Sequence, residues 1–196
     1  MERLLRNVNA ANTVTILRML LIPVVVAFLV VEIPYGYAVA VALFILAAST
    51  DKLDGYLARS RDSVTTFGQF MDPLADKLLI AAPLIALVSM DRLPAWVAMV
   101  IIAREFAVSA LRIVGLAQGV SIPADRFGKI KTFFQIAAVV SLMLPHSLFG
   151  GWTATGDTIV EVALVAIAVL LTVASGVNYF WKARDVLRIP GTDPRC

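Results

Sequence analysis

The sequence predicts an all-α integral membrane protein with six transmembrane helices and a short amphipathic segment in front of them. Of the 196 residues, 60% are hydrophobic and only 16% are charged. Six apolar stretches follow one another, each close to the roughly 20 residues that a helix needs to span a bilayer. Turn-forming or charged residues separate them. A soluble domain of this size would not use so much apolar sequence, and no basic tract suggests a nucleic-acid partner.

In chain order, we expect the six spans at residues 14–31, 35–58, 70–90, 94–116, 127–145 and 158–181. Before them, apolar and basic residues form an amphipathic pattern suited to the membrane surface. A frayed N-terminal tail is an equally good interpretation of this segment. No linker is long enough to divide domains. We therefore expect a single membrane domain over 1–196, made of an interfacial segment (1–12), a six-helix bundle (13–182) and a cytoplasmic tail (183–196).

The positive charges predict the orientation. Six spans place both termini on one side, and every Lys and Arg except Arg92 falls on that side or at adjoining helix ends. Both termini should therefore be cytoplasmic, and the lack of a Ser-rich leader fits a bacterial plasma membrane. Aromatic side chains near the span ends suggest interface anchors, namely Trp96, Trp152, Trp181, Tyr35, Tyr37 and Tyr179. The only cysteine is Cys196.

Four aspartates lie where a membrane protein tolerates them least. Asp51 and Asp54 close the second span, and Asp72 and Asp76 open the third. Their spacings of three and four residues place each pair on one helical face. At about 1.5 Å of rise per residue, both pairs should lie just inside the cytoplasmic edge of the bilayer. Ionisable residues at such positions are by default candidates for function.

The four carboxylates predict a metal centre. Two divalent cations would balance four negative charges, and an all-oxygen site suits Mg²⁺ first and Mn²⁺ after it. Paired metals are a recurring device for phosphoryl transfer. One alternative is that the aspartates form salt bridges with Lys52, Arg59, Arg61 and Lys77. Another is a divalent-cation channel or transporter, and a structural membrane protein is a third.

A set of cationic side chains follows in the next two spans. The fourth span carries Arg104 and Arg112, eight residues apart, and the fifth opens with Lys129, Lys131 and Thr132. Such groups suit a phosphate-bearing substrate, such as the acceptor in a phosphoryl-transfer reaction, which Arg would bind as a bidentate fork and Lys as a point charge. Glycerol 3-phosphate and inositol phosphate both fit. The alternative is a topological signal combined with pairing of Glu105 to one of the two arginines.

The stretch from Asp51 to Asp76 resembles the complete signature of the CDP-alcohol phosphotransferases. It reads D-x-x-D-G-x-x-A-R, then eight residues, then G-x-x-x-D-x-x-x-D, and all eight fixed positions match. Less specific motifs of the same family occur at 12–18, 103–106 and 128–132, so the resemblance runs nearly end to end. Ala11 departs from it, because the family usually has proline there.

The resemblance implies a CDP-alcohol phosphotransferase-like bundle that transfers the phosphatidyl group of CDP-diacylglycerol to glycerol 3-phosphate. It implies two metal ions held by Asp51, Asp54, Asp72 and Asp76, with Asp76 also acting as the general base. It implies that CDP-diacylglycerol is bound by Asp51, Asp54, Gly55, Ala58, Arg59, Gly68, Asn12 and Thr15. A homodimer is implied as well. Sister enzymes that use inositol phosphate or phosphatidylglycerol as the acceptor stay open.

Overall fold

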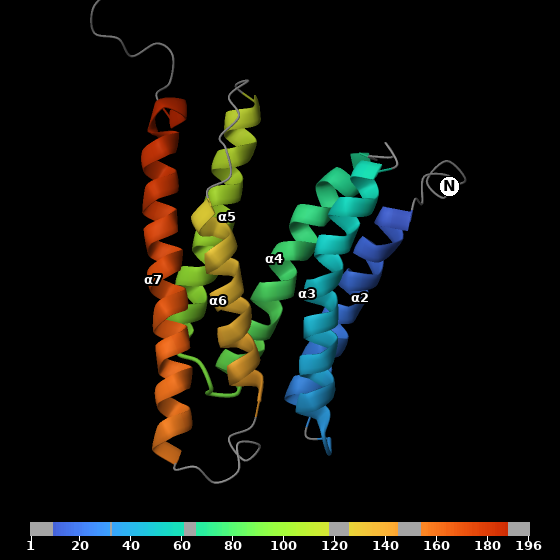
Figure 1. The fold of residues 1–196 in the computed structure, drawn as a ribbon, viewed down its shortest axis with the longest axis vertical. Coiled ribbons are helices and arrows are strands. Elements are labelled where there is room, and N and C mark those ends of the chain that lie inside the picture. The colour runs from blue at the N-terminus through green and yellow to red at the C-terminus, as the bar shows by residue number, and fades with distance from the viewer. Residues whose placement is uncertain (1–9, 32, 61–65, 118–125, 145–153, 188–196) are drawn as a thin grey trace, which may run out of the picture. The chain divides into compact units, whose positions relative to one another are not determined.

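The computed structural model describes residues 10–31, 33–60, 66–117, 126–144 and 154–187, with side chains at 15–31, 33–50, 71–115, 130–144 and 159–184. Within these ranges the chain is all-helical and has no strand (Figure 1). The six helices are α2 (Ala10–Val30), α3 (Gly36–Ser60), α4 (Thr66–Ser89), α5 (Ala95–Ala117), α6 (Arg126–Met143) and α7 (Ala154–Leu187).

Each helix coincides with one predicted span, so the prediction of six helices is confirmed for the described residues. The largest difference is at α7, which continues to Leu187 and so runs beyond the predicted end of the bundle at residue 182. Its additional last turn contains Arg184, and basic residues are favoured at the C-terminal end of a helix. Residues 1–9 of the predicted interfacial segment (1–12) and residues 188–196 of the predicted tail (183–196) lie outside the described residues.

Two short turns connect the first four spans in pairs. Between α2 and α3, Tyr35 has a φ of 63°, and a Cβ added at Gly36 would lie 2.8 Å from the carbonyl oxygen of Phe28. Only glycine fits so close to backbone. Between α4 and α5, Asp91 has a φ of 55° and the backbone N–H of Arg92 donates to the carbonyl oxygen of Leu87 at 2.9 Å. Helices α2 and α4 therefore each end in a tight turn.

The chain divides into two compact units. The first comprises residues 1–95 and 139–151, and in it α2 packs against both α3 and α4. Fully buried apolar side chains from these helices form its core, including Val25, Phe44 and Leu87. This packing places the N-terminal halves of α2 and α4 side by side, which determines the geometry of the aspartates described below.

The second unit comprises residues 96–138 and 152–196 and contains α5, α7 and most of α6. The buried face of α7 carries small or hydroxyl-bearing side chains, namely Ala168, Thr172, Ser175, Gly176, Tyr179 and Ala183. Tyr179 and Ala183 pack against Val108 and Leu111 of α5. The opposite face of α7 exposes large apolar residues such as Leu170 and Val177.

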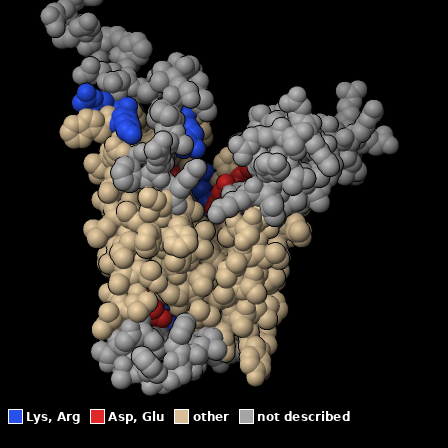
Figure 2. Space-filling model, viewed as in Figure 1, with Lys and Arg blue, Asp and Glu red and all other residues tan. Residues whose placement is uncertain are grey.

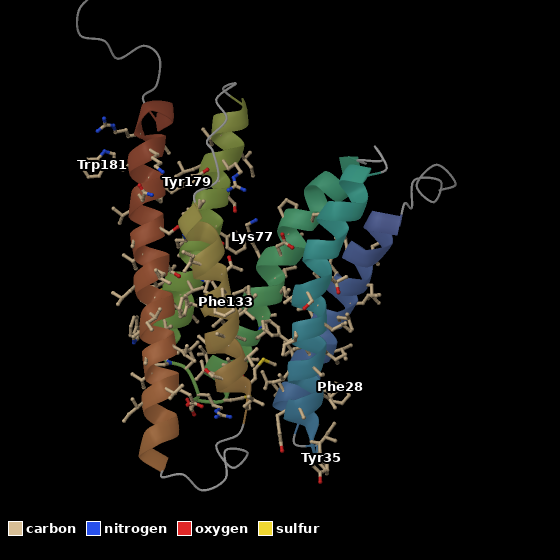
Figure 3. The ribbon with its side chains drawn as sticks, in the orientation of Figure 1. Phe28, Tyr35, Lys77, Phe133, Tyr179 and Trp181 are labelled. Atoms are coloured by element: carbon tan, nitrogen blue, oxygen red, sulfur yellow. The ribbon has the colours of Figure 1, made fainter. Side chains whose placement is uncertain are left out.

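The prediction that Tyr179 anchors the chain at a membrane interface is wrong, because only 4% of Tyr179 is exposed. Trp181 follows two residues later and is 67% exposed, pointing outward from α7 in Figure 3. Two residues turn a helix by about 200°, so the two aromatic rings lie on opposite sides of α7. Trp96 and Tyr35 are also exposed.

In length and composition, one described helical stretch, Ile159–Arg184 of α7, is sufficient to cross a bilayer. Shorter apolar stretches occur at Thr15–Val30, Gly36–Thr50 and Ile130–Met143. In Figure 2 the sides of each unit are almost entirely uncharged, and Lys and Arg gather toward the C-terminal end of α7. The remaining predicted membrane crossings stay predictions.

Candidate functional site

The four signature aspartates lie on two helices of the first unit. Asp51 and Asp54 belong to α3, and Asp72 and Asp76 lie one turn apart near the beginning of α4. The structure describes the side chains of Asp72 and Asp76, both exposed. For the other signature residues the structure describes the helical position and not the side chain, namely for Asp51, Asp54, Gly55, Ala58, Arg59 and Gly68. The same holds for Asn12 of α2.

Helix α2 supplies one hydrogen-bond donor to Asp72 and another to Asp76. Thr15 Oγ1 donates to Asp72 Oδ1 at 2.5 Å, and Arg18 Nη1 donates to Asp76 Oδ1 at 2.7 Å. Arg18 is 2% exposed, whereas the Asp76 side chain is 47% exposed. Thr15 and Arg18 lie three residues apart on α2, and their partners Asp72 and Asp76 lie four residues apart on α4, so each pair occupies one helical face. Thr15, which is expected to bind the nucleotide, thus also contacts a predicted metal ligand.

For the salt-bridge alternative, the described side chains include an ion pair of a signature aspartate, at Asp76, and its partner differs from those considered. Asp76 pairs with Arg18, while Lys77 Nζ donates to the carbonyl oxygen of Pro73 on its own helix at 2.8 Å. The charged group of Arg18 is buried, so Asp76 supplies the opposite charge that a buried cation requires. Sequence reasoning quoted Arg18 within a family motif and assigned it no role.

The donor chemistry of this region fits a hard divalent cation. Asp72 and Asp76 provide carboxylate oxygens, each engages Oδ1 with α2, and both side chains are exposed. Oxygen ligands of this kind suit Mg²⁺ or Mn²⁺. Among the described side chains, no three His, Cys, Asp or Glu residues come together, and the other two candidate ligands, Asp51 and Asp54, are not among them.

A second polar cluster lies in the second unit, where α5, α6 and α7 meet. Lys131 Nζ of α6 donates to Glu105 Oε1 of α5. Arg104 Nη1 lies 3.4 Å from the same oxygen, and Arg104 Nη2 donates to Ser175 Oγ of α7 at 2.6 Å. Lys131 is only 3% exposed. One carboxylate therefore holds two cations in a region where an unpaired charge would be costly.

Of the five residues expected to bind the acceptor phosphate, four have described side chains. Arg104 and Lys131 meet through Glu105, whereas Arg112 and Thr132 are exposed. Eight residues rotate a helix by about 80° beyond two full turns, which moves Arg112 off the face of Arg104. The side chain of Lys129 lies outside the described ones.

Sequence reasoning missed the contribution of α7 to this cluster. Besides Ser175, Thr172 is fully buried, accepts a hydrogen bond from Gln135 Nε2 of α6 at 3.3 Å, and donates to the carbonyl oxygen of Ala168 at 2.6 Å. Hydroxyl and small residues recur every three or four positions from 168 to 183. This stripe within an apolar span was the available signal, because polar groups in such a span face other helices.

Curated relatives cover nearly the full length of the chain. The CDP-diacylglycerol–glycerol-3-phosphate 3-phosphatidyltransferase of Bacillus subtilis is 42% identical over 192 residues, which cover 92% of this chain and 97% of the relative. The probable phosphatidylglycerophosphate synthase of Mycobacterium tuberculosis is 41% identical over 186 residues, covering 92% and 85%. A Rickettsia felis protein with the same name as that of Bacillus is 38% identical over 172 residues, covering 88% and 93%.

The family model for CDP-alcohol phosphatidyltransferases matches residues 8–174. The match includes α2 with Thr15 and Arg18, all four signature aspartates, and the cationic residues of α5 and α6. With the aspartate signature complete and relatives aligned over nearly the whole length, the chain belongs to the CDP-alcohol phosphatidyltransferase family.

Proposed function

We propose that this protein transfers the phosphatidyl group of CDP-diacylglycerol to sn-glycerol 3-phosphate, giving phosphatidylglycerophosphate and CMP in phospholipid biosynthesis. The observation that carries the proposal is the complete aspartate signature in a chain whose relatives, at 38–42% identity, have names that state this donor and acceptor. The partly buried cluster of Arg104, Glu105 and Lys131 supports an acceptor that is itself anionic.

The first unit would hold the donor. Asp51, Asp54, Asp72 and Asp76 would bind two Mg²⁺ or Mn²⁺ ions, which when bound neutralise the diphosphate and the charge that develops on departing CMP. Gly55, Ala58 and Gly68 would let the nucleotide approach the helix backbones, Arg59 would contact the diphosphate, and Asn12 and Thr15 would complete the binding surface. Thr15 and Arg18 would hold Asp72 and Asp76 in place through their observed contacts.

The chemical step is an in-line displacement. Asp76 takes the proton from the attacking hydroxyl of glycerol 3-phosphate, and that oxygen forms a bond to the β-phosphorus of CDP-diacylglycerol. The bond between the β-phosphorus and the bridging oxygen breaks, and CMP carries that oxygen away. Arg18 donates to one oxygen of Asp76 at 2.7 Å, and the Asp76 side chain is 47% exposed. This contact would help to orient Asp76 for proton transfer.

The second unit would hold the acceptor. Arg104 and Lys131 would bind its phosphate, assisted by Lys129, Arg112 and Thr132. The same chemistry would accept inositol phosphate, and a sister enzyme could use phosphatidylglycerol, so the choice of acceptor rests on the names of the relatives. A homodimer is part of the proposal through the family alone.

We also propose that the protein is integral to a bacterial plasma membrane, with both termini and the active site cytoplasmic. The exposed apolar face of α7 supports this location, because soluble proteins rarely expose so much contiguous apolar surface. The one-sided distribution of Lys and Arg supports the orientation. Membrane lipid would then be both the surroundings of the protein and the source of its donor substrate.

The test is CMP release by the purified protein in detergent with CDP-diacylglycerol and Mg²⁺. We expect release with glycerol 3-phosphate and none with inositol phosphate, serine or phosphatidylglycerol. EDTA and the substitution Asp72→Ala should each abolish the release. Asp91→Asn is the matched control, because Asp91 is an exposed aspartate in the turn between α4 and α5 and should keep full activity.

Other outcomes separate the alternatives. Release with a different acceptor would keep the reaction and refute the choice of glycerol 3-phosphate. Metal-dependent ion flux in vesicles without any CMP release would refute the proposal in favour of a cation pathway through the aspartates.

A further inference from the structure

The starting point is the path of the Arg104 side chain across α7. A Cβ added at Gly176 would lie 3.2 Å from Arg104 Cγ and 4.0 Å from Arg104 Nε. The neighbouring residue, Ser175, accepts a hydrogen bond from Arg104 Nη2 at 2.6 Å. The aliphatic part of Arg104 therefore lies against the position where Gly176 lacks a side chain, and its guanidinium reaches the next residue of the same helix.

Helix stability does not explain glycine at position 176. Glycine is disfavoured inside a helix, where alanine is the most favourable residue. Close packing of helix backbones is the usual reason for a buried glycine in an apolar span. Apart from α7's own adjacent residues and backbone, however, the atoms within 4 Å of the added Cβ both belong to the Arg104 side chain, and no backbone atom of another described helix is among them. Gly176 therefore accommodates the Arg104 side chain.

The guanidinium is held at two of its three nitrogens. Nη2 is bonded to Ser175 and Nη1 lies 3.4 Å from Glu105 Oε1, while the buried Nε has no hydrogen-bond partner among the described groups. An arginine held in this way loses little further freedom when it binds a planar or tetrahedral oxyanion. Its orientation depends on the stem lying where a methyl group at position 176 would displace it by a few tenths of an ångström.

We propose that Gly176 is a positioning residue for the acceptor: together with Ser175 it forms a seat on α7 that fixes the Arg104 guanidinium for a phosphate monoester. This inference rests on the proposed function, in which Arg104 binds the phosphate of the acceptor. Gly176 itself touches no substrate. It acts by leaving space, and the affinity for the anionic acceptor is the property that it controls.

The decisive variant is Gly176→Ala. We expect the KM for glycerol 3-phosphate to rise about tenfold, with kcat and the KM for CDP-diacylglycerol nearly unchanged. The melting temperature should stay equal or rise, because alanine favours the helix. A merely structural glycine would give the opposite combination, with an unchanged KM or a loss of stability that lowers all activity together. Ala174→Ser, which adds one atom on the exposed face of the same turn, should change nothing.

A double-mutant comparison connects the effect to Arg104. Binding of glycerol 3-phosphate is measured by calorimetry for the wild type, Gly176→Ala, Arg104→Ala and the double variant. Arg104→Ala removes Cγ, so the further change at 176 should then have no effect on the binding constant. Equal weakening by Gly176→Ala in both backgrounds would overturn the inference.

Failure of the proposed function would be recognised separately. If the wild type binds glycerol 3-phosphate but releases no CMP, the reaction is wrong, and the calorimetric comparison still tests the seat. If the wild type releases CMP and Gly176→Ala keeps the wild-type KM, the reaction is retained and the seat is refuted.

Discussion

Asp76 combines exposure with a buried partner. Its carboxylate is half-exposed, whereas Arg18, which holds it, is almost completely buried. The contact with the buried cation orients the carboxylate, and the exposed part of the side chain would be accessible to a substrate hydroxyl. This combination suits a group that must accept a proton in one defined direction.

Replacing Asp76 with Asn tests this role. Asn keeps the size and the contact with Arg18 but accepts no proton at neutral pH, so kcat should fall by about 10²–10⁴-fold. Binding of CDP-diacylglycerol should persist, because the nucleotide contacts proposed for α3 and α4 are retained. Turnover and equilibrium binding of the lipid nucleotide are measured on the same preparation. Near-normal turnover would show that another group is the base.

Tyr179 predicts a gain in stability. Its hydroxyl is buried and has no hydrogen-bond partner among the described groups, which costs free energy. Tyr179→Phe removes the hydroxyl and should raise the free energy of unfolding by about 1 kcal/mol. Thermal unfolding in detergent measures the change, and Tyr35→Phe, at a 74% exposed position, should have no effect. A less stable Tyr179→Phe protein would show that the hydroxyl has a partner after all.

At the scale of the helix, the buried face of α7 positions its neighbours. Its buried stripe holds a hydroxyl for α6 at Thr172 and one for α5 at Ser175, so it holds both helices of the cationic cluster by hydrogen bonds. Apolar contacts tolerate sliding of one helix along another, whereas a buried hydrogen bond allows one register. The register of α6 determines that Lys131 lies against Glu105.

The bond between Gln135 and Thr172 should therefore stabilise the unit as a pair. Thr172→Val leaves the amide of Gln135 buried without this partner and should lower the free energy of unfolding by about 1–3 kcal/mol. Gln135→Leu combined with Thr172→Val should cost less than the sum of the single changes. Chemical unfolding of the four proteins gives the coupling. Strict additivity would show that the bond does not exist in the folded protein.

The sequence predicted the helices well because periodic apolar runs between turn residues have few alternatives in a chain of this composition. It also indicated Arg104 and Lys131 as candidate site residues, because charged residues within apolar spans are conspicuous. Ser175 and Gly176 were not found, because small residues in an apolar span look the same whether they serve packing or a neighbouring arginine. Their role depends on which helix lies opposite, and that is a tertiary property.

For the whole molecule, the proposed orientation can be tested with the single cysteine. Cys196 is the last residue and should lie in the cytoplasm. A membrane-impermeant maleimide should then label it in inside-out vesicles and leave it unlabelled in intact cells. Ser147→Cys in a Cys196→Ser background reports the connection between the fifth and sixth spans and should show the reverse pattern. Labelling of Cys196 from outside intact cells would overturn the topology.

The division into units also has a consequence for synthesis of the chain. The first unit is assembled from residues 1–95 and 139–151, and Arg92 Nη2 donates to the carbonyl oxygen of Leu144 at 3.1 Å. A ribosome must therefore make α5 and nearly all of α6 before the unit that carries the aspartates has all of its parts. The helices with the aspartates are made early and complete their packing late, so newly made chains must pass through a stage in which the first unit is present but unfinished.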